Sequence, residues 1–201
     1  MRAAYSYVYA LLPALLWPLA FLAFREVFVQ AMLGATLVLA ISTVAFRRGA
    51  LRLGAGAREV ALGLLAAIPL YLVFVAGKHF LAALGYFYAV EQVYSMVRES
   101  ARRDLLLATA LCAIGASEEV YWRGGLLSFL VERFGSTRAA LAVMVSYYTL
   151  VHVYTLNPAL MLGALVVGAY TGLVATRLGL AAAVSTHVAW LYLVILLFPL
   201  G

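Results

Sequence analysis

The segment LLLATALCAIGASEEVYWR, residues 105–123, is an apolar run that ends in two adjacent glutamates and an arginine. A helix that crosses a bilayer core of about 30 Å needs about 20 predominantly apolar residues, and Leu105 to Trp122 is long enough. A charged side chain costs about 2.5 to 3.5 kcal/mol at the centre of such a helix, so Glu118, Glu119 and Arg123 need a specific reason to be there. The default reason is a functional site.

The composition places the whole chain in a membrane. Of its 201 residues 67% are hydrophobic and 11% are charged, and the mean hydropathy is +1.04. A soluble globule with a polar surface cannot be built from this composition. The net charge of +6 is spread over short clusters between apolar runs, as in the loops of membrane proteins. We therefore expect the lipid bilayer as a partner and no nucleic acid.

The apolar runs predict an all-α, polytopic bundle of about seven transmembrane helices. The runs are Ala3 to Phe24, Val27 to Phe46, Val60 to Gly77, Leu105 to Trp122, Ala139 to Leu156, Ala159 to Thr176 and Leu178 to Leu200. His79 to Val97 is apolar and Tyr-rich but carries Glu91 and Gln92, so it either lies along the interface, which we prefer, or forms an eighth span. The first run is interpreted as an uncleaved first helix.

Basic residues set the expected orientation. Four arginines cluster after the second run, namely Arg47, Arg48, Arg52 and Arg58. This cluster predicts that the loop and the N-terminus are cytoplasmic. An eighth span would move the later loops to the opposite side, so the face to which the glutamates open stays undecided.

Two short patterns predict local packing. Gly168 and Gly172 form a GxxxG pattern, which we expect to pack the sixth run against a neighbour within the bundle rather than to drive dimerisation. Asn157-Pro158 predicts a tight turn between two spans, because the residue before a proline disfavours helix.

Three of the predicted helices carry ionisable side chains. Glu119 and Arg123 are four residues apart and share a helix face, so they are expected to pair, whereas Glu118 lies about 100° around the helix. His152 and His187 lie in the fifth and seventh runs. This combination suits hydrolysis, in which a carboxylate takes a proton from water and imidazoles orient that water or stabilise the oxyanion. A structural ion pair and packing histidines remain the alternatives for each residue taken singly.

The sequence resembles a family of membrane proteases at three motifs in order. The run SEEVYWRGGLL, Ser117 to Leu127, is similar to the EExxxR motif of the CPBP intramembrane proteases, which include type II CAAX prenyl endopeptidases and bacteriocin-processing proteins. Tyr148 to His152 resembles the second motif, FxxxH, with tyrosine in place of phenylalanine. His187 stands where the third motif, HxxxN, begins. The resemblance extends over about half of the chain.

The resemblance implies an intramembrane endopeptidase of the CAAX type, with either a glutamate-type or a metallo mechanism. Its substrate would be a membrane-associated protein that is lipidated or carries a C-terminal sorting tail. Glu118 would be the general base, supported by Glu119 and Arg123, while His152 would activate or position the water and His187 would face the scissile carbonyl oxygen. No HExxH occurs, so we prefer a site without a structural metal, and the cofactor stays unknown.

No linker, low-complexity tract or internal repeat divides the chain, and the resemblance covers its later half. We treat residues 1–201 as one integral-membrane domain, with 1–104 as preceding helices and interfacial segment and 105–201 as the catalytic core. The expected location is the inner (cell) membrane of a bacterium, with several membrane crossings.

The third motif departs from the family pattern at one position. Leu191 stands where the motif has asparagine, and it cannot donate a hydrogen bond. The residues considered as substitutes are Trp190, Tyr192, Ser185 and Thr186. A divergent branch such as the myxosortases, a loss of activity, a non-catalytic membrane chaperone or transport component, and a haem protein ligated by both histidines stay open as alternatives.

Overall fold

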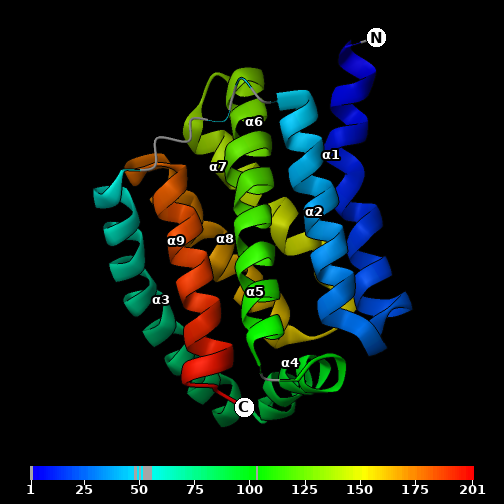
Figure 1. Cartoon of the computed structure of the whole chain (residues 1–201), viewed down its shortest axis with the longest axis vertical. Helices are drawn as coiled ribbons and strands as arrows, with labels where there is room; N and C mark the ends of the chain where they lie inside the picture. The colour runs from blue at the N-terminus through cyan, green and yellow to red at the C-terminus, as the bar shows by residue number, and fades with distance from the viewer. Residues whose placement is uncertain (1, 48, 50, 52–55, 103) are drawn as a thin grey trace.

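The structure is a computed structural model that describes residues 2–47, 49, 51, 56–102 and 104–201. Arg48 and Arg52 of the basic cluster lie outside these residues. The elements in chain order are α1 Arg2–Pro18, η1 Leu19–Ala23, η2 Arg25–Val27, α2 Phe28–Arg47, α3 Ala57–Ala83, α4 Phe87–Ser100, α5 Leu105–Glu119, η4 Val120–Leu126, α6 Leu127–Phe134, α7 Thr137–Leu150, η5 Val153–Thr155, α8 Pro158–Leu178, α9 Leu180–Leu191 and η6 Tyr192–Leu197. All of them are helical, which confirms the all-α class, and most run side by side along the long axis (Figure 1).

The helices occupy the seven predicted spans, but they differ in length. Within the described residues, five are long and apolar enough to cross a membrane, namely Arg25–Arg47, Ala57–Ala83, Leu105–Phe134, Pro158–Leu178 and Leu180–Leu197. Within the residues whose side chains the structure describes, the first helix contributes the apolar stretch Val8–Ala23, and α7 has 14 residues. At 1.5 Å per residue α7 rises about 21 Å, less than a bilayer core. The chain is an integral, multi-pass membrane protein.

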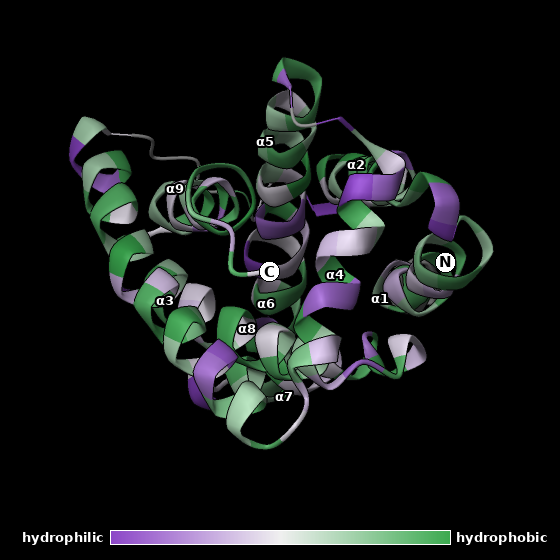
Figure 2. Ribbon diagram, turned by 90° about the horizontal axis from the view of Figure 1, so that it is seen from below, coloured by the Kyte–Doolittle hydropathy of each residue, from purple (hydrophilic) through white to green (hydrophobic). Residues whose placement is uncertain are grey.

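Helix α4 lies across one end of the bundle, as Figures 1 and 2 both show. Its 14 residues mix hydrophilic and hydrophobic side chains along the ribbon in Figure 2. Asn157 Nδ2 donates to the carbonyl oxygen of Ala89 at 2.8 Å, and the hydroxyl of Tyr94 donates to that of Val194. This placement favours the interfacial interpretation over an eighth span. The segment His79 to Val97 is not one helix, because its first residues complete α3.

The helix that carries the glutamates is longer than the sequence predicts. We expected it to end at Trp122, but α5 continues through the π-helix η4 into α6, and the whole helix spans 30 residues to Phe134. The Gly-Gly pair after Arg123 does not break it. A Cβ on Gly125 would overlap the hydroxyl of Tyr9 and the side chain of Thr43, so glycine here lets α1 and α2 approach.

The turn before α8 and the packing of the GxxxG pattern within α8 are both confirmed. Asn157 caps α8 by accepting from the backbone N of Leu160 at 2.9 Å, with Pro158 in the first turn. A Cβ on Gly168 would lie 3.0 Å from Cδ1 of Tyr148, and one on Gly172 would lie 2.5 Å from Cδ1 of Leu141. The small residues therefore pack α8 against α7 within the bundle.

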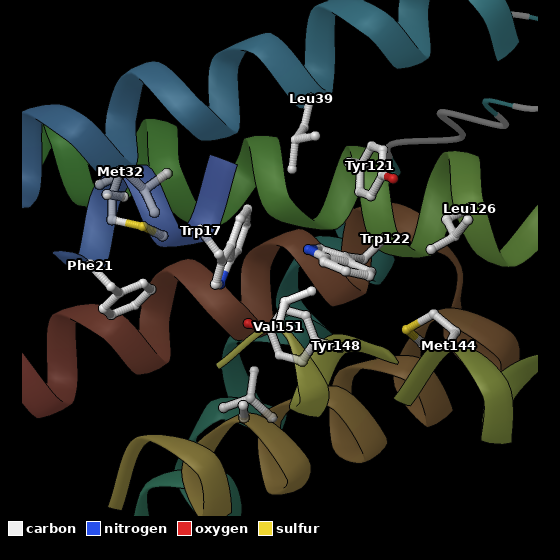
Figure 3. Packing of buried hydrophobic residues seen from close by; sticks show 14 of the residues in the cluster. Trp17, Phe21, Met32, Leu39, Tyr121, Trp122, Leu126, Met144, Tyr148 and Val151 are labelled. Carbon is white, nitrogen blue, oxygen red and sulfur yellow. The ribbon is translucent and has the colours of Figure 1, made fainter. Parts of the chain in front are cut away.

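The core is aromatic where α1 meets η4 and α7. Trp17 and Trp122 are fully buried and their rings meet edge to face, with centroids 6.1 Å apart (Figure 3). Tyr121 donates from its hydroxyl to the carbonyl oxygen of Tyr9 at 2.9 Å, and Tyr147 donates to that of Ala10 at 2.8 Å. These bonds attach the first helix to the segment that carries the motifs.

Close packing of α3 on α9 depends on Gly63. A Cβ at this position would overlap the carbonyl oxygen of Ala182 and lie 2.9 Å from its Cα, and these backbone atoms cannot rotate away. We expect Gly63→Ala to lower the free energy of unfolding by about 1 to 3 kcal/mol through overpacking. Gly77→Ala, on the same helix with nothing within 4 Å, is the matched control and is expected to stabilise by up to about 1 kcal/mol. Equal unfolding temperatures for the two variants in one detergent would contradict this packing.

Candidate active site

Glu119 is the centre of a buried ionic group. It is fully buried at the end of α5, and its Oε1 accepts from Nη1 of Arg123 at 2.9 Å and from Nδ1 of His187 at 2.7 Å. The predicted pair of Glu119 with Arg123 is confirmed. The bond to His187 joins α5 to α9, and because a carboxylate only accepts, it places a hydrogen on Nδ1.

Arg123 extends this group to two more helices. Its Nη2 donates to the carbonyl oxygens of Val167 at 3.4 Å and Gly168 at 3.3 Å, both on α8. Its guanidinium carbon lies 5.0 Å from the ring centroid of Tyr148 on α7. Gly168 lets Tyr148 lie close to α8, and in this position the phenol ring also contacts Arg123.

Glu118 points away from this ionic group, as its position around the helix predicts. Its Oε2 accepts a 2.7 Å hydrogen bond from the hydroxyl of Tyr148. Its Oε1 accepts none from the described residues, and Glu118 lines a cavity. One oxygen is thus fixed by the protein and the other is left for a molecule in the cavity.

Both ring nitrogens of His152 are engaged. Nδ1 lies 2.7 Å from the carbonyl oxygen of Tyr148, and Nε2 accepts from Nε1 of Trp17 at 3.2 Å. A carbonyl accepts and an indole donates, so the imidazole is neutral with its hydrogen on Nδ1. Within the described residues no hydrogen bond joins His152 to Glu118 or Glu119, and its role toward water stays a prediction. An engaged Nε2 also does not suit an axial haem ligand.

Trp17 is the site residue that sequence reasoning missed. It lies on α1, outside every motif, yet it holds His152 and packs on its ring with centroids 5.9 Å apart. The available signal was weak: a tryptophan in an apolar run needs an acceptor for its indole N–H, but nothing in the sequence names the acceptor.

The cavity has a volume of about 420 Å³ and is mainly apolar. Its walls come from the helices around the site and from α4. Polar side chains on its wall include Glu118, Tyr148, His152 and His187. The three segments that carry the motifs therefore each contribute polar side chains to the same cavity.

The side chains present do not fit a resident metal ion. In the part of the chain that the structure describes, no group of three or more His, Cys, Asp or Glu residues is placed to hold one. Both nitrogens of His152 are engaged, and Oε1 of Glu119 already binds two donors. We derive no chemical step through a metal.

Leu191 occupies the wall of the cavity where the third motif has asparagine. Its side chain packs on α5, because a Cβ on Gly115 would lie 3.0 Å from Cδ1 of Leu191. The position is therefore filled by a methyl group and offers no donor.

A comparison of families agrees with the motifs. Residues 102–193 match the family described as Type II CAAX prenyl endopeptidase Rce1-like. The match includes all five predicted site residues and confirms the resemblance of this part of the chain to the CAAX-type (CPBP) membrane proteases. No curated protein and no solved structure gives a significant match.

Without Arg123 the fully buried carboxylate of Glu119 loses its cationic partner and keeps only the hydrogen bond from His187. We expect Arg123→Met to lower the free energy of unfolding by on the order of 3 to 5 kcal/mol, and Glu119→Leu in the same chain to recover part of this loss. Arg47→Met is the control: Arg47 pairs with Glu132 at 2.6 Å, and 61% of the glutamate side chain is exposed. An exposed pair contributes about 1 kcal/mol at most. Titration with a denaturing detergent, followed by circular dichroism, measures the difference. Equal destabilisation by both arginine variants is the contrary outcome.

Replacement of Trp17 by phenylalanine removes the donor to His152 and keeps an aromatic ring. In ¹⁵N spectra of histidine-labelled protein we expect Nε2 of His152 to move toward the position of an unbonded imine nitrogen. Nδ1 should stay protonated, because the carbonyl of Tyr148 still accepts from it. Phe21→Leu is the control, since Phe21 touches the same imidazole at 5.7 Å between centroids without an N–H group. An unmoved Nε2 signal in Trp17→Phe rules out the indole bond.

Proposed function

We propose that the chain is an endopeptidase that hydrolyses a peptide bond of a membrane-associated protein, lipidated or with a C-terminal sorting tail, through water activated by Glu118. One observation carries this proposal. Glu118 presents an oxygen to an apolar cavity of about 420 Å³ while Tyr148 holds its other oxygen. The mainly apolar walls suit a lipid chain or a hydrophobic peptide, and the polar side chains on them include the reacting group.

One of two protonation states of the site suits the reaction. With both glutamates ionised and Arg123 cationic, the sum is −1, and one further proton makes this buried group neutral. That proton resides either on Glu118 or on Nε2 of His187, whose Nδ1 already donates to Glu119. When it resides on His187, Glu118 is an ionised base and the imidazolium presents Nε2–H to the cavity. The base and a donor for the oxyanion thus exist in the same state.

The reaction then proceeds in two proton transfers. Glu118 Oε1 takes a proton from water while the water oxygen bonds to the scissile carbonyl carbon, and the carbonyl π electrons move to its oxygen. His187 donates a hydrogen bond to that oxyanion. When the C–N bond breaks, its electron pair stays on nitrogen and Glu118 returns the proton to it. One water is consumed, and the products are a carboxyl group and an amine.

The remaining residues position this centre. Arg123 and His187 hold Glu119, and Tyr148 holds Glu118. His152 binds the carbonyl of Tyr148 and lines the cavity, so it fixes the residue that orients the base. Assistance to the water by His152 itself requires that its Nε2 leave Trp17.

The domain boundaries and the location are part of the proposal. Residues 105–201 form the catalytic core and 1–104 the supporting helices, with Trp17 as a contribution of the latter to the site. We propose the inner (cell) membrane of a bacterium as the location.

Glu118→Gln removes the base and keeps an acceptor for Tyr148. We expect kcat to fall by roughly 100- to 10,000-fold, the usual contribution of a general base, with an unchanged unfolding temperature. The assay uses proteoliposomes and an internally quenched peptide with a farnesylated cysteine followed by two aliphatic residues and a free C-terminus. Glu91→Gln, on the exposed face of α4, is the matched control and should cleave like the wild type.

The same variant tests the cellular substrate. Termini of membrane proteins from cells with wild type are compared with those from cells with Glu118→Gln, and substrates are the proteins whose new termini depend on Glu118. Equal product from both forms would contradict the proposal. A partner captured equally by both forms, with product from neither, would instead support a non-catalytic membrane chaperone or transport component.

A further inference from the structure

Hydrolysis at this cavity develops an oxyanion, which preorganised hydrogen-bond donors stabilise. The family motif places an amide at the position of Leu191, and here that position holds only methyl groups on the cavity wall. Loss of one oxyanion donor lowers kcat by roughly 100- to 1,000-fold when nothing replaces it. A replacement for the missing amide would have to come from neighbouring donors on α9 and η6.

Three of these neighbours are already committed to the backbone. Tyr192 donates from its hydroxyl to the carbonyl oxygen of Ala108 at 2.9 Å. The hydroxyl of Ser185 donates to the carbonyl oxygen of Ala181 at 2.9 Å, and the hydroxyl of Thr186 donates to the carbonyl oxygen of Gly63 at 3.0 Å. None of the three hydroxyls has a hydrogen left for a ligand.

Trp190 is different. Its Nε1 is buried and has no acceptor among the described residues, while the side chain lines the same cavity as Glu118 and His187. Its ring centroid lies 5.6 Å from that of His187, one helical turn earlier on α9. A buried N–H without a partner is costly and rare, and the side chain that carries this one lines the cavity in which a substrate carbonyl would lie.

The other two tryptophans do not have both of these properties, an unpartnered indole N–H and a place on the cavity wall. The chain has three, and the indole N–H of Trp17 is taken by His152. The N–H of Trp122 is also buried and has no acceptor in the described part of the chain, but Trp122 is absent from the lining of the cavity. Among the tryptophans, Trp190 alone both lines the cavity and has an indole N–H without an acceptor in the described residues.

We propose that Trp190 donates its indole N–H to the oxyanion in place of the missing amide, beside Nε2–H of His187. The assignment rests on the proposed function and adds a catalytic residue to it. Phe74 packs on the indole with centroids 4.6 Å apart, so the donor is held in place before substrate binds. Such preorganisation is what makes a hydrogen bond effective on a developing charge.

Trp190→Phe keeps an aromatic ring and removes the donor. With the farnesylated reporter peptide we expect kcat to fall roughly 100- to 1,000-fold and KM to change by less than about threefold. Leu191→Asn in the same chain returns the amide of the family motif and is expected to restore at least a tenfold part of the loss. Trp122→Phe is the matched control, because it removes an equally unpartnered N–H outside the cavity, and its kcat should stay within a few-fold of wild type. The unfolding temperature of each variant is measured alongside.

A second readout needs no turnover. The phosphonate analogue of the reporter peptide carries a tetrahedral, anionic centre at the scissile position. In protein labelled with ¹⁵N at its indole nitrogens, the N–H signal of Trp190 should move downfield when this analogue binds, and that of Trp122 should not. Replacement of each tryptophan by phenylalanine assigns the signals.

The outcomes separate the two proposals. A wild type that neither cleaves the peptide nor binds the phosphonate overturns the proposed function and the role of Trp190 with it. If the wild type cleaves, then an unchanged kcat in Trp190→Phe, an unmoved Trp190 signal, or failure of Leu191→Asn to restore activity overturns the role of Trp190 alone.

Discussion

The carboxylate of Glu119 is the constraint on which the rest of the site depends. A charge with no exposed surface is tolerated only when hydrogen-bonded partners of opposite charge surround it. Arg123 supplies the opposite charge and His187 supplies a second hydrogen bond, so the carboxylate fixes α9 against α5, while the guanidinium reaches the carbonyl oxygens of α8. Glu118 is the adjacent residue on α5, so the same contacts between helices hold its backbone in place. Its direction into the cavity is set by the helix turn and by one bond to Tyr148.

The first helices belong to the site as much as to the scaffold. The family match begins at residue 102, yet Trp17 on α1 donates the hydrogen bond that occupies Nε2 of His152. The glycine at 125 and the bonds to the backbone of Tyr9 and Ala10 hold α1 close enough for this. The segment that carries the motifs thus acquires its histidine geometry from a helix that no motif predicts.

The sequence predicted much of the fold because its signals were local. Hydropathy located the helices, Asn157-Pro158 located a turn, and the spacing of Glu119 and Arg123 predicted their pair. It failed where a local signal was ambiguous. The apolar run predicted a helix that ends at Trp122, but the π-helix η4 continues the helix to Phe134. The length of α7 was overestimated because the turn after it is as apolar as the helix.

The sequence by itself determined the membrane setting, the all-α class and the identity of the ionisable residues, because composition, hydropathy and residue spacing along one helix are properties of the chain alone. Only the tertiary structure decided which donors are occupied. Whether the hydrogens of Tyr192, Thr186 and Trp190 are spent on the backbone or left for a ligand depends on what lies opposite each of them. Those opposite atoms come from helices distant in sequence, and their approach is set by the packing of the whole bundle.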